Sequence, residues 1–271
     1  MPNFQLKNGY YVVTGGLGLL GKKHCEAISK YGGTPLIIDI NKNEFKEFAE
    51  YILKTYEKKM IFFDIDITKE SSLEKIIEEC KSLPLPIRGL VNNAARNPIV
   101  KKKGLDNQNR LENFCLEEWN KDLNVGLTGA FLCTKYFGSI MNEGFGGVIV
   151  NISSDLGLIA PNQELYKDKK LSESSQPVKP VSYSVVKSGL IGLTRYTATY
   201  WPKKVRCNCL CAGGVKNDQN PEFISKVNDL IPMGRLAEQE EYMAPIIFML
   251  SEASSYMNGS IISIDGGRTA W

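Results

Sequence analysis

The sequence is poor in several features that assign a chain to a common class of protein. It contains one histidine, His24, so acid–base chemistry has to depend on other residue types. The formal net charge is +3, which is too small to indicate binding to nucleic acid. No run of residues is long and apolar enough to span a bilayer, and the first residues lack a signal-peptide pattern. We therefore expect a cytoplasmic protein that binds neither nucleic acid nor membrane.

The cysteines do not suggest an extracellular disulfide framework. Three of the seven, Cys207, Cys209 and Cys211, alternate along a predicted strand and so lie on one side of it. A metal site there is conceivable, but buried free thiols in a reducing cytoplasm are the better interpretation. We expect no metal.

Short apolar runs alternate with helical patterns along the whole chain. This alternation predicts an α/β protein with one doubly wound, Rossmann-type parallel sheet of about seven strands and helices on both faces. A single domain over residues 1–271 is expected, since 43% of the residues are hydrophobic. The predicted strands are 10–13, 35–40, 60–65, 89–92, 148–152, 205–210 and 260–264. The predicted helices are 19–31, 42–57, 71–81, 116–140, 182–201 and 238–250.

Two segments are predicted to be insertions on this scaffold, residues 99–113 and residues 161–180. Ligands bind at the carboxyl ends of the strands in such sheets, so both segments are candidates for shaping substrate access. Lysines in both would suit an anionic substrate, although solvated loops explain them equally well. These lysines are Lys101, Lys102, Lys103, Lys167, Lys169, Lys170 and Lys179.

A glycine-rich turn, Thr14-Gly15-Gly16-Leu17-Gly18-Leu19-Leu20-Gly21, joins the first predicted strand to the first predicted helix. Glycine lets the backbone turn tightly and approach a pyrophosphate, which then lies against the helix N-terminus. The turn therefore predicts a dinucleotide site. Asp39, which ends the second predicted strand, can accept hydrogen bonds from ribose hydroxyls and repel a 2′-phosphate, so NAD is favoured over NADP.

Tyr183 and Lys187 stand four residues apart at the start of a predicted helix and so share one face. The ammonium charge would favour the ionised phenol and lower the pKa of the tyrosine towards neutrality. Such a phenol can take a proton from an alcohol or give one to a ketone. A second pair, Tyr166 and Lys170, lies in a polar segment predicted to be an exposed loop, which would not hold the two side chains in register.

These motifs, in this order, resemble the short-chain dehydrogenase/reductase family over nearly the whole chain. Further matching segments are Asp66-Ile67-Thr68, Asn92-Asn93-Ala94-Ala95, Val150-Asn151-Ile152-Ser153-Ser154, Cys211-Ala212-Gly213-Gly214-Val215 and Ile264-Asp265-Gly266-Gly267. The resemblance implies that Asn124, Ser154, Tyr183 and Lys187 form the catalytic set. It implies that NAD is bound by Gly15, Gly18, Leu19, Leu20, Gly21, Asp39, Asp66, Ile67, Asn93, Ala94, Ala95, Tyr183, Lys187, Gly213 and Val215.

The chain departs from the family pattern in several places. Ala212 replaces a proline, and Asn217 stands where a threonine often touches the carboxamide, which affects the expected nicotinamide contacts. The gap from Ser154 to Tyr183 is longer than in the family, and Tyr166 falls at the typical distance. Tyr183 is preferred because its helix context matches the family and residues 161–180 read as an insert.

The predicted function is NAD-dependent interconversion of a secondary alcohol and a ketone. The glycine turn and the long insert resemble dehydrogenases associated with surface-sugar biosynthesis, which implies a sugar or sugar-phosphate substrate. Two alternatives stay open: a 3-oxoacyl-type reductase, and a non-catalytic NAD-binding sensor or scaffold. The family resemblance also implies a homo-oligomer, either a dimer or a tetramer.

Overall fold

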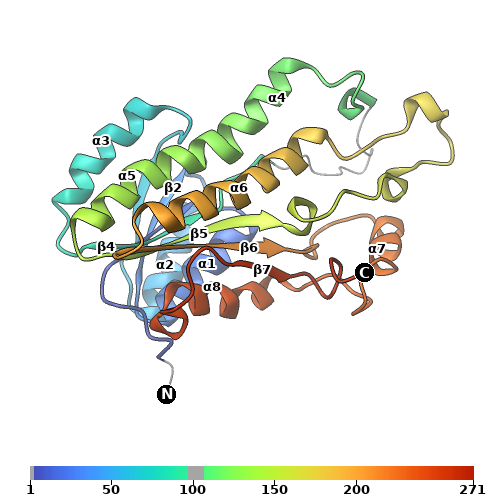
Figure 1. Cartoon of the computed structure of the whole chain (residues 1–271). Helices are drawn as coiled ribbons and strands as arrows, with labels where there is room; N and C mark the ends of the chain where they lie inside the picture. The colour runs from blue at the N-terminus through green and yellow to red at the C-terminus, as the bar shows by residue number, and fades with distance from the viewer. Residues whose placement is uncertain (1–2, 97–106) are drawn as a thin grey trace.

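The computed structural model describes residues 3–96 and 107–271 of the chain. Seven strands form one parallel sheet in the order β3-β2-β1-β4-β5-β6-β7 (Figure 1). The strands are β1 (Tyr10–Thr14), β2 (Thr34–Asp39), β3 (Ile61–Asp64), β4 (Ile87–Asn92), β5 (Gly147–Ser154), β6 (Val205–Ala212) and β7 (Ile261–Ile264). The predicted α/β fold is confirmed, and each strand begins within a few residues of its predicted start.

The strand order reverses beside β1, which pairs with β2 on one side and β4 on the other. Such a reversal leaves a crevice at the carboxyl ends of the strands, where open α/β sheets bind their ligands. The central strands are covered on both faces, so their side chains form near-continuous apolar runs. Val12, Val13, Leu90 and Val91 are all fully buried.

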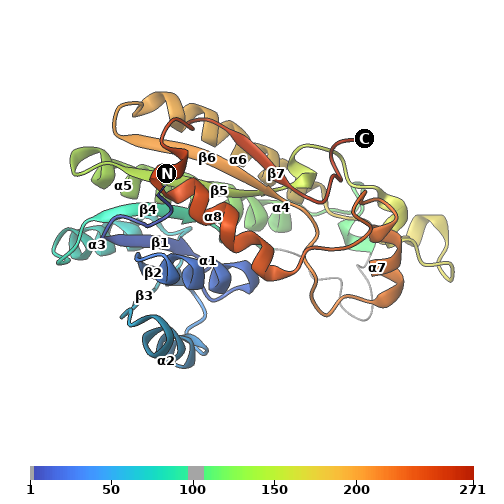
Figure 2. The same cartoon turned by 90° about the horizontal axis from the view of Figure 1, so that it is seen from below.

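Helices cover the two faces of the sheet (Figures 1 and 2). On one face lie α1 (Leu19–Lys30), α2 (Phe45–Tyr56) and α8 (Met243–Leu250). On the other lie α3 (Glu70–Lys81), α4 (Leu116–Leu123), α5 (Gly129–Glu143) and α6 (Val181–Tyr200). None of the helices that the structure describes is long and apolar enough to cross a membrane.

The helix predicted over residues 116–140 is not continuous. A π-type turn, Asn124–Thr128, separates α4 from α5. The π-type turn packs closely against α6, since a Cβ atom on Gly126 would lie 2.5 Å from the Cγ1 atom of Val186. Single π-type turns in α-helices occur frequently at functional sites, and this one lies beside the carboxyl-end crevice.

One helix, α7 (Pro221–Asn228), was not predicted. It has eight residues, about two helical turns, which are too few for its apolar positions to establish a helical period. Its start carried a usable signal, because Asn220 is an N-cap whose side chain accepts a 2.8 Å hydrogen bond from the Glu222 N–H, and Pro221 follows at the first helical position.

Residues 161–180 form an ordered segment, with 3₁₀ turns at Gln163–Tyr166 and Glu173–Ser175. The buried side chain of Gln176 holds it together. The Gln176 amide donates to the carbonyls of Asp168 and Leu171 at 2.9 and 2.7 Å, and its oxygen accepts from the Asp168 N–H at 2.8 Å. The other predicted insertion includes Lys101, Lys102 and Lys103, which lie outside the described residues.

The three cysteines of β6 are fully buried, as the buried-thiol interpretation expected. The sulfur atoms of Cys209 and Cys211 lie 4.0 Å apart, and both cysteines are free. They contribute to the packing between β6 and α6.

Candidate active site

A pocket of about 920 Å³ opens at the carboxyl ends of the strands. Its wall is formed by the glycine-rich turn, the ends of β2, β4, β5 and β6, the insert and the start of α6. Most of the predicted site residues line it: Gly15, Gly18, Leu19, Leu20, Asp39, Asp66, Ile67, Asn93, Ala94, Ala95, Ser154, Tyr183, Lys187, Gly213 and Val215. Ala212 and Asn217, the two departures from the family pattern, line it as well.

The glycine-rich turn suits a dinucleotide. Gly15 has a φ of +61°, and a Cβ atom there would lie 2.9 Å from the Cα atom of Ala94. The residue must therefore be glycine for the turn to lie against the end of β4. Gly18 caps α1 and faces the pocket, so the helix N-terminus can receive a pyrophosphate. Gly21 lies outside the pocket wall and packs against the carbonyl oxygen of Gly15.

Hydrogen bonds lock this turn to the end of β4. The Asn93 amide donates to the carbonyl oxygens of Thr14 and Gly15, both at 3.0 Å. The Thr14 hydroxyl oxygen accepts from the Asn93 and Ala94 N–H groups at 3.0 and 3.1 Å. These bonds give the predicted Asn-Asn-Ala-Ala segment a physical role, since they hold the cofactor side of the pocket in one shape.

Asp39 is fixed at the pocket by two backbone hydrogen bonds. One carboxylate oxygen accepts from the Leu17 N–H and the other from the Asn41 N–H, each at 3.0 Å. Each oxygen keeps a second lone pair for a ribose hydroxyl. Two lysines near this end are paired with other carboxylates: Lys42 with Asp64 at 3.2 Å, and Lys22 with Glu44.

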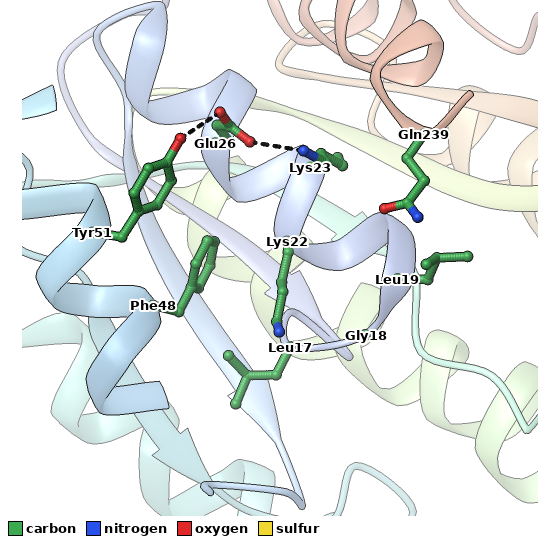
Figure 3. A pocket seen from close by; sticks show the side chains of 9 residues that line it. All are labelled: Leu17, Gly18, Leu19, Lys22, Lys23, Glu26, Phe48, Tyr51 and Gln239. Carbon is green, nitrogen blue, oxygen red and sulfur yellow. Dashed lines mark hydrogen bonds and ion pairs between the residues drawn. The ribbon is translucent and has the colours of Figure 1, made fainter. Parts of the chain in front are cut away.

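A smaller hollow of about 420 Å³ lies outside the turn, between α1 and α2 (Figure 3). It adjoins the main pocket through Leu17, Gly18 and Leu19. Its charged groups satisfy one another, because Glu26 accepts from the Tyr51 hydroxyl at 2.8 Å and pairs with Lys23 at 3.4 Å. This hollow therefore presents paired charges, whereas the main pocket concentrates the predicted site residues.

Ser154, Tyr183 and Lys187 meet at the substrate end of the main pocket. Ser154 is the last residue of β5, while Tyr183 and Lys187 lie one turn apart on α6. The Lys187 ammonium donates a 2.9 Å hydrogen bond to the Ile152 carbonyl and lies 5.7 Å from the centre of the Tyr183 ring. The structure thus brings three of the four predicted catalytic residues together.

The fourth predicted catalytic residue, Asn124, does not join them. It lies in the π-type turn with its side chain exposed, and it is not part of the pocket wall. The next residue, Val125, lines the pocket instead. Asn124 is therefore one residue away from the position that lines the pocket, and its catalytic role stays a prediction.

Burial dominates the pKa values of Tyr183 and Lys187. Loss of solvent raises the pKa of Tyr183 to about 12, with a contribution from the Asp155 charge that a hydrogen bond with Ser154 opposes. Loss of solvent also lowers the pKa of Lys187 to about 8. The prediction that Lys187 brings the pKa of Tyr183 towards neutrality is therefore wrong for the protein alone, because desolvation disfavours both charged forms.

Tyr166 is not on an exposed loop, so that prediction is also wrong. It lines the pocket, and its ring centre lies 5.7 Å from that of Phe223 on α7. Burial raises its pKa above the ordinary range. Tyr166 ends a single 3₁₀ turn, whereas Tyr183 lies on a long helix beside Ser154, so the geometry still favours Tyr183 as the proton-transfer group.

Three charged residues lie at the substrate end, and of these the sequence singled out only Lys179, as one lysine of the insert. Asp155 accepts a 2.6 Å hydrogen bond from the Ser154 hydroxyl and one of 2.8 Å from the Leu156 N–H. Lys179 lies over the Tyr183 ring, 3.8 Å from its centre, and Arg268 lines the pocket. Asp155 follows Ser154 directly in the sequence, and Lys179 stands four residues before Tyr183, which was the available signal.

The family model for short chain dehydrogenase matches residues 10–167, and that for enoyl-(acyl carrier protein) reductase matches residues 171–269. The chain belongs to the short-chain dehydrogenase/reductase family. It is therefore an oxidoreductase that acts on CH–OH groups, in a family that binds NAD(P).

Similar proteins carry the names of different activities. An uncharacterized oxidoreductase of Thermotoga maritima is 33% identical over 280 residues, covering 99% of both chains. A 3-oxoacyl-(acyl-carrier-protein) reductase of Aquifex aeolicus is 30% identical, covering 97% of this chain and 98% of the relative. The crystal structure of a gluconate 5-dehydrogenase from Burkholderia cenocepacia, in complex with NADP and tartrate, has the same fold, with a TM-score of 0.83 at 22% identity and coverage of 100% and 98%.

The Lys187→Met variant tests the buried ammonium charge. The pKa of Lys187 is near 8 in the folded protein and higher in the unfolded chain, so its charge destabilises the folded state at neutral pH. As the pH rises above about 8, the folded protein loses this proton while the unfolded chain keeps it, and the destabilisation becomes smaller. Relative to Lys187→Met, the free energy of unfolding of the unmodified protein should rise by roughly 1–2 kcal/mol between about pH 7 and about pH 9.5. Urea denaturation at both pH values measures this, and an identical pH dependence in the two proteins would contradict it.

Proposed function

We propose that this protein is an NAD-dependent oxidoreductase that interconverts a secondary alcohol and a ketone on a sugar or sugar-phosphate substrate. The observation that carries the proposal is the meeting of Ser154, Tyr183 and Lys187 at one end of a pocket whose other end holds Asp39. A bound nicotinamide cofactor supplies the hydride donor or acceptor. A purely non-catalytic sensor would not need the three groups at the opposite end.

Each of the three residues has a role that follows from its position. Ser154 can donate a hydrogen bond to the substrate oxygen and stabilise the charge that develops on it. Tyr183 transfers the proton, and its raised pKa keeps it neutral at physiological pH, the form that donates a proton to a ketone oxygen. Lys187 is held by the Ile152 carbonyl at a distance where its charge favours the phenolate when an alcohol is oxidised.

The preference for NAD rests on Asp39 and on the pairing of the nearby lysines. A 2′-phosphate would meet the fixed carboxylate of Asp39. Lys42 and Lys22, which could otherwise neutralise a 2′-phosphate, are paired with Asp64 and Glu44.

The substrate end supports a polar substrate and also keeps one rival open. Asn162, Lys179 and Arg268 line it, which suits a hydroxyl-rich or charged molecule. Leu165, Phe223 and other apolar side chains line it too, and together with the Aquifex aeolicus relative they support the rival, a 3-oxoacyl-type reductase. The surface-sugar link, the homo-oligomer and the cytoplasmic location stay predictions.

Replacing each tyrosine of the pocket by phenylalanine tests the assignment of the proton-transfer group. Tyr183→Phe should lower kcat by about 10²–10⁴, because only the phenolic hydroxyl is lost, while NAD binding stays intact. Tyr166→Phe should change kcat less than about tenfold, because Tyr166 shapes the pocket without transferring the proton. The measurement is steady-state turnover with NAD(H) across sugars, polyols and a 3-oxoacyl thioester. A dead Tyr166→Phe enzyme beside an active Tyr183→Phe enzyme would reverse the assignment.

Calorimetry tests the cofactor preference. The unmodified protein should bind NADH at least about tenfold more tightly than NADPH, and Asp39→Ala should narrow the difference, because it removes the repulsive carboxylate. Lys30→Ala, a change on the exposed end of α1, serves as the matched control. Equal affinity of the unmodified protein for the two cofactors would contradict the proposal.

A further inference from the structure

The hydroxyl group of Ser154 is already committed in the free site. It donates a 2.6 Å hydrogen bond to one oxygen of the Asp155 carboxylate, and its own oxygen accepts from the Leu156 N–H at 3.2 Å. A serine hydroxyl has one proton to donate and two lone pairs that accept. Ser154 therefore keeps one lone pair for the pocket and has no free proton to offer there.

Asp155 is fixed where it can hold this bond. The carboxylate oxygen that accepts from Ser154 also accepts from the Leu156 N–H at 2.8 Å, so the backbone turn that follows β5 orients the carboxylate. A distance of 2.6 Å between a hydroxyl and a carboxylate is typical of a charge-assisted hydrogen bond, which is stronger than a bond between neutral groups. Any other acceptor in the site has to compete with Asp155 for the Ser154 hydroxyl.

The phenolate of Tyr183 is one such competitor. A phenolate can only accept hydrogen bonds, and a hydrogen bond that Ser154 donates to it lowers the pKa of Tyr183. While Ser154 donates to Asp155, Ser154 can only accept from Tyr183, and this favours the neutral phenol. The oxyanion of a substrate is a second competitor, because it too can only accept.

Other charged and titratable groups surround these side chains, so their effects have to be separated from the effect of the hydrogen bond. Burial raises the pKa of Asp155, and the charge of Asp265 adds to the rise, while its two hydrogen bonds and the charge of Arg268 oppose it. The groups that face Asp155 or Tyr183 are Tyr166 and Lys179 on the insert, Asp122 on α4 behind Lys179, Lys187 on α6, Cys211 on β6, Tyr242 at the start of α8, and Asp265 and Arg268 after β7. These groups act on Tyr183 through space, whereas the hydrogen bond of Asp155 acts through Ser154, and this difference can be measured.

We propose that Asp155 is a positioning residue that directs the Ser154 hydroxyl away from Tyr183 until a negative charge forms on the phenol or on the substrate oxygen. The proposal rests on the proposed function, because it concerns the proton transfer in the same pocket. Ser154 keeps its own proton throughout, since the hydroxyl turns from one acceptor to another and no covalent bond changes. In the absence of substrate, the arrangement keeps the proton on Tyr183.

A double-mutant cycle at Asp155 and Ser154 tests the proposal, with the pKa of Tyr183 as the readout. NMR of protein labelled with ¹³C on the tyrosine rings follows the titration with saturating NAD⁺, and in a second series with NADP⁺, so no substrate is needed. Asp155→Asn should lower the pKa of Tyr183 by at least about one unit, because Ser154 can then donate to the phenolate in a charge-assisted bond. In the Ser154→Ala background the same substitution should lower this pKa by less than about half as much, because only the charge of Asp155 is left to remove.

Asp265→Asn serves as the matched control for the loss of a nearby carboxylate. Asp265 faces Asp155, but it accepts its hydrogen bonds from the Gly267 and Thr269 N–H groups and the Thr269 hydroxyl. Its substitution should move the pKa of Tyr183 by less than about half a unit, because it leaves the bond between Ser154 and Asp155 in place.

Two outcomes would overturn the proposal. One is an unchanged pKa of Tyr183 in Asp155→Asn, and the other is an equal fall in both backgrounds, which would show that Asp155 acts by its charge alone. Asp155→Ala repeats the cycle if Asp155→Asn has a lower melting temperature than the unmodified protein, since the Leu156 N–H still has Ser154 as an acceptor. A cycle that follows the prediction in a protein that oxidises no alcohol would leave the role of Asp155 standing and count against the proposed function alone.

Discussion

The buried contact between the end of β5 and the first turns of α6 is the constraint on which the site depends. The Lys187 ammonium donates to the Ile152 carbonyl at 2.9 Å, and the Ser153 hydroxyl donates to the Lys187 carbonyl at 2.7 Å. Ser154 ends that strand and Tyr183 precedes Lys187 by one helical turn, so two hydrogen bonds set the position of the three predicted catalytic groups. Breaking either bond would leave a buried polar group unpaired, which costs roughly 1–3 kcal/mol.

The same burial sets the chemistry. Burial raises the pKa of Tyr183 and lowers that of Lys187, so the free protein keeps Tyr183 as a neutral phenol, the form that can donate a proton. In the proposed reaction, proton abstraction from an alcohol needs positive charge near the phenol, and the ammonium groups of Lys179 and Lys187 lie 3.8 and 5.7 Å from the centre of the ring. Asp155, which accepts a hydrogen bond from Ser154, carries a negative charge that opposes the two ammonium charges.

Local sequence signals predicted the parts that local physics determines. Alternating apolar runs located the strands, and the glycine turn with Asp39 located the cofactor end, because backbone freedom and periodicity are properties of short segments. Asn124 lies in the π-type turn and outside the pocket wall, so its catalytic role stays a prediction. Tyr166 and Arg268 were missed because the packing of the insert against α7, and the course of the chain after β7, depend on tertiary contacts that no short motif encodes.

The most direct test of this account is the titration of Tyr183 itself, by NMR of protein labelled with ¹³C at the tyrosine ring carbon that bears the hydroxyl. The Tyr183→Phe spectrum identifies its signal among those of the 12 tyrosines. The free protein should show no ionisation of Tyr183 below about pH 11, and NAD⁺ should lower the pKa of Tyr183 by at least about two units. An ordinary pKa near 10 in the free protein, or no change on addition of NAD⁺, would contradict the claim that burial and charge at this contact control the proton.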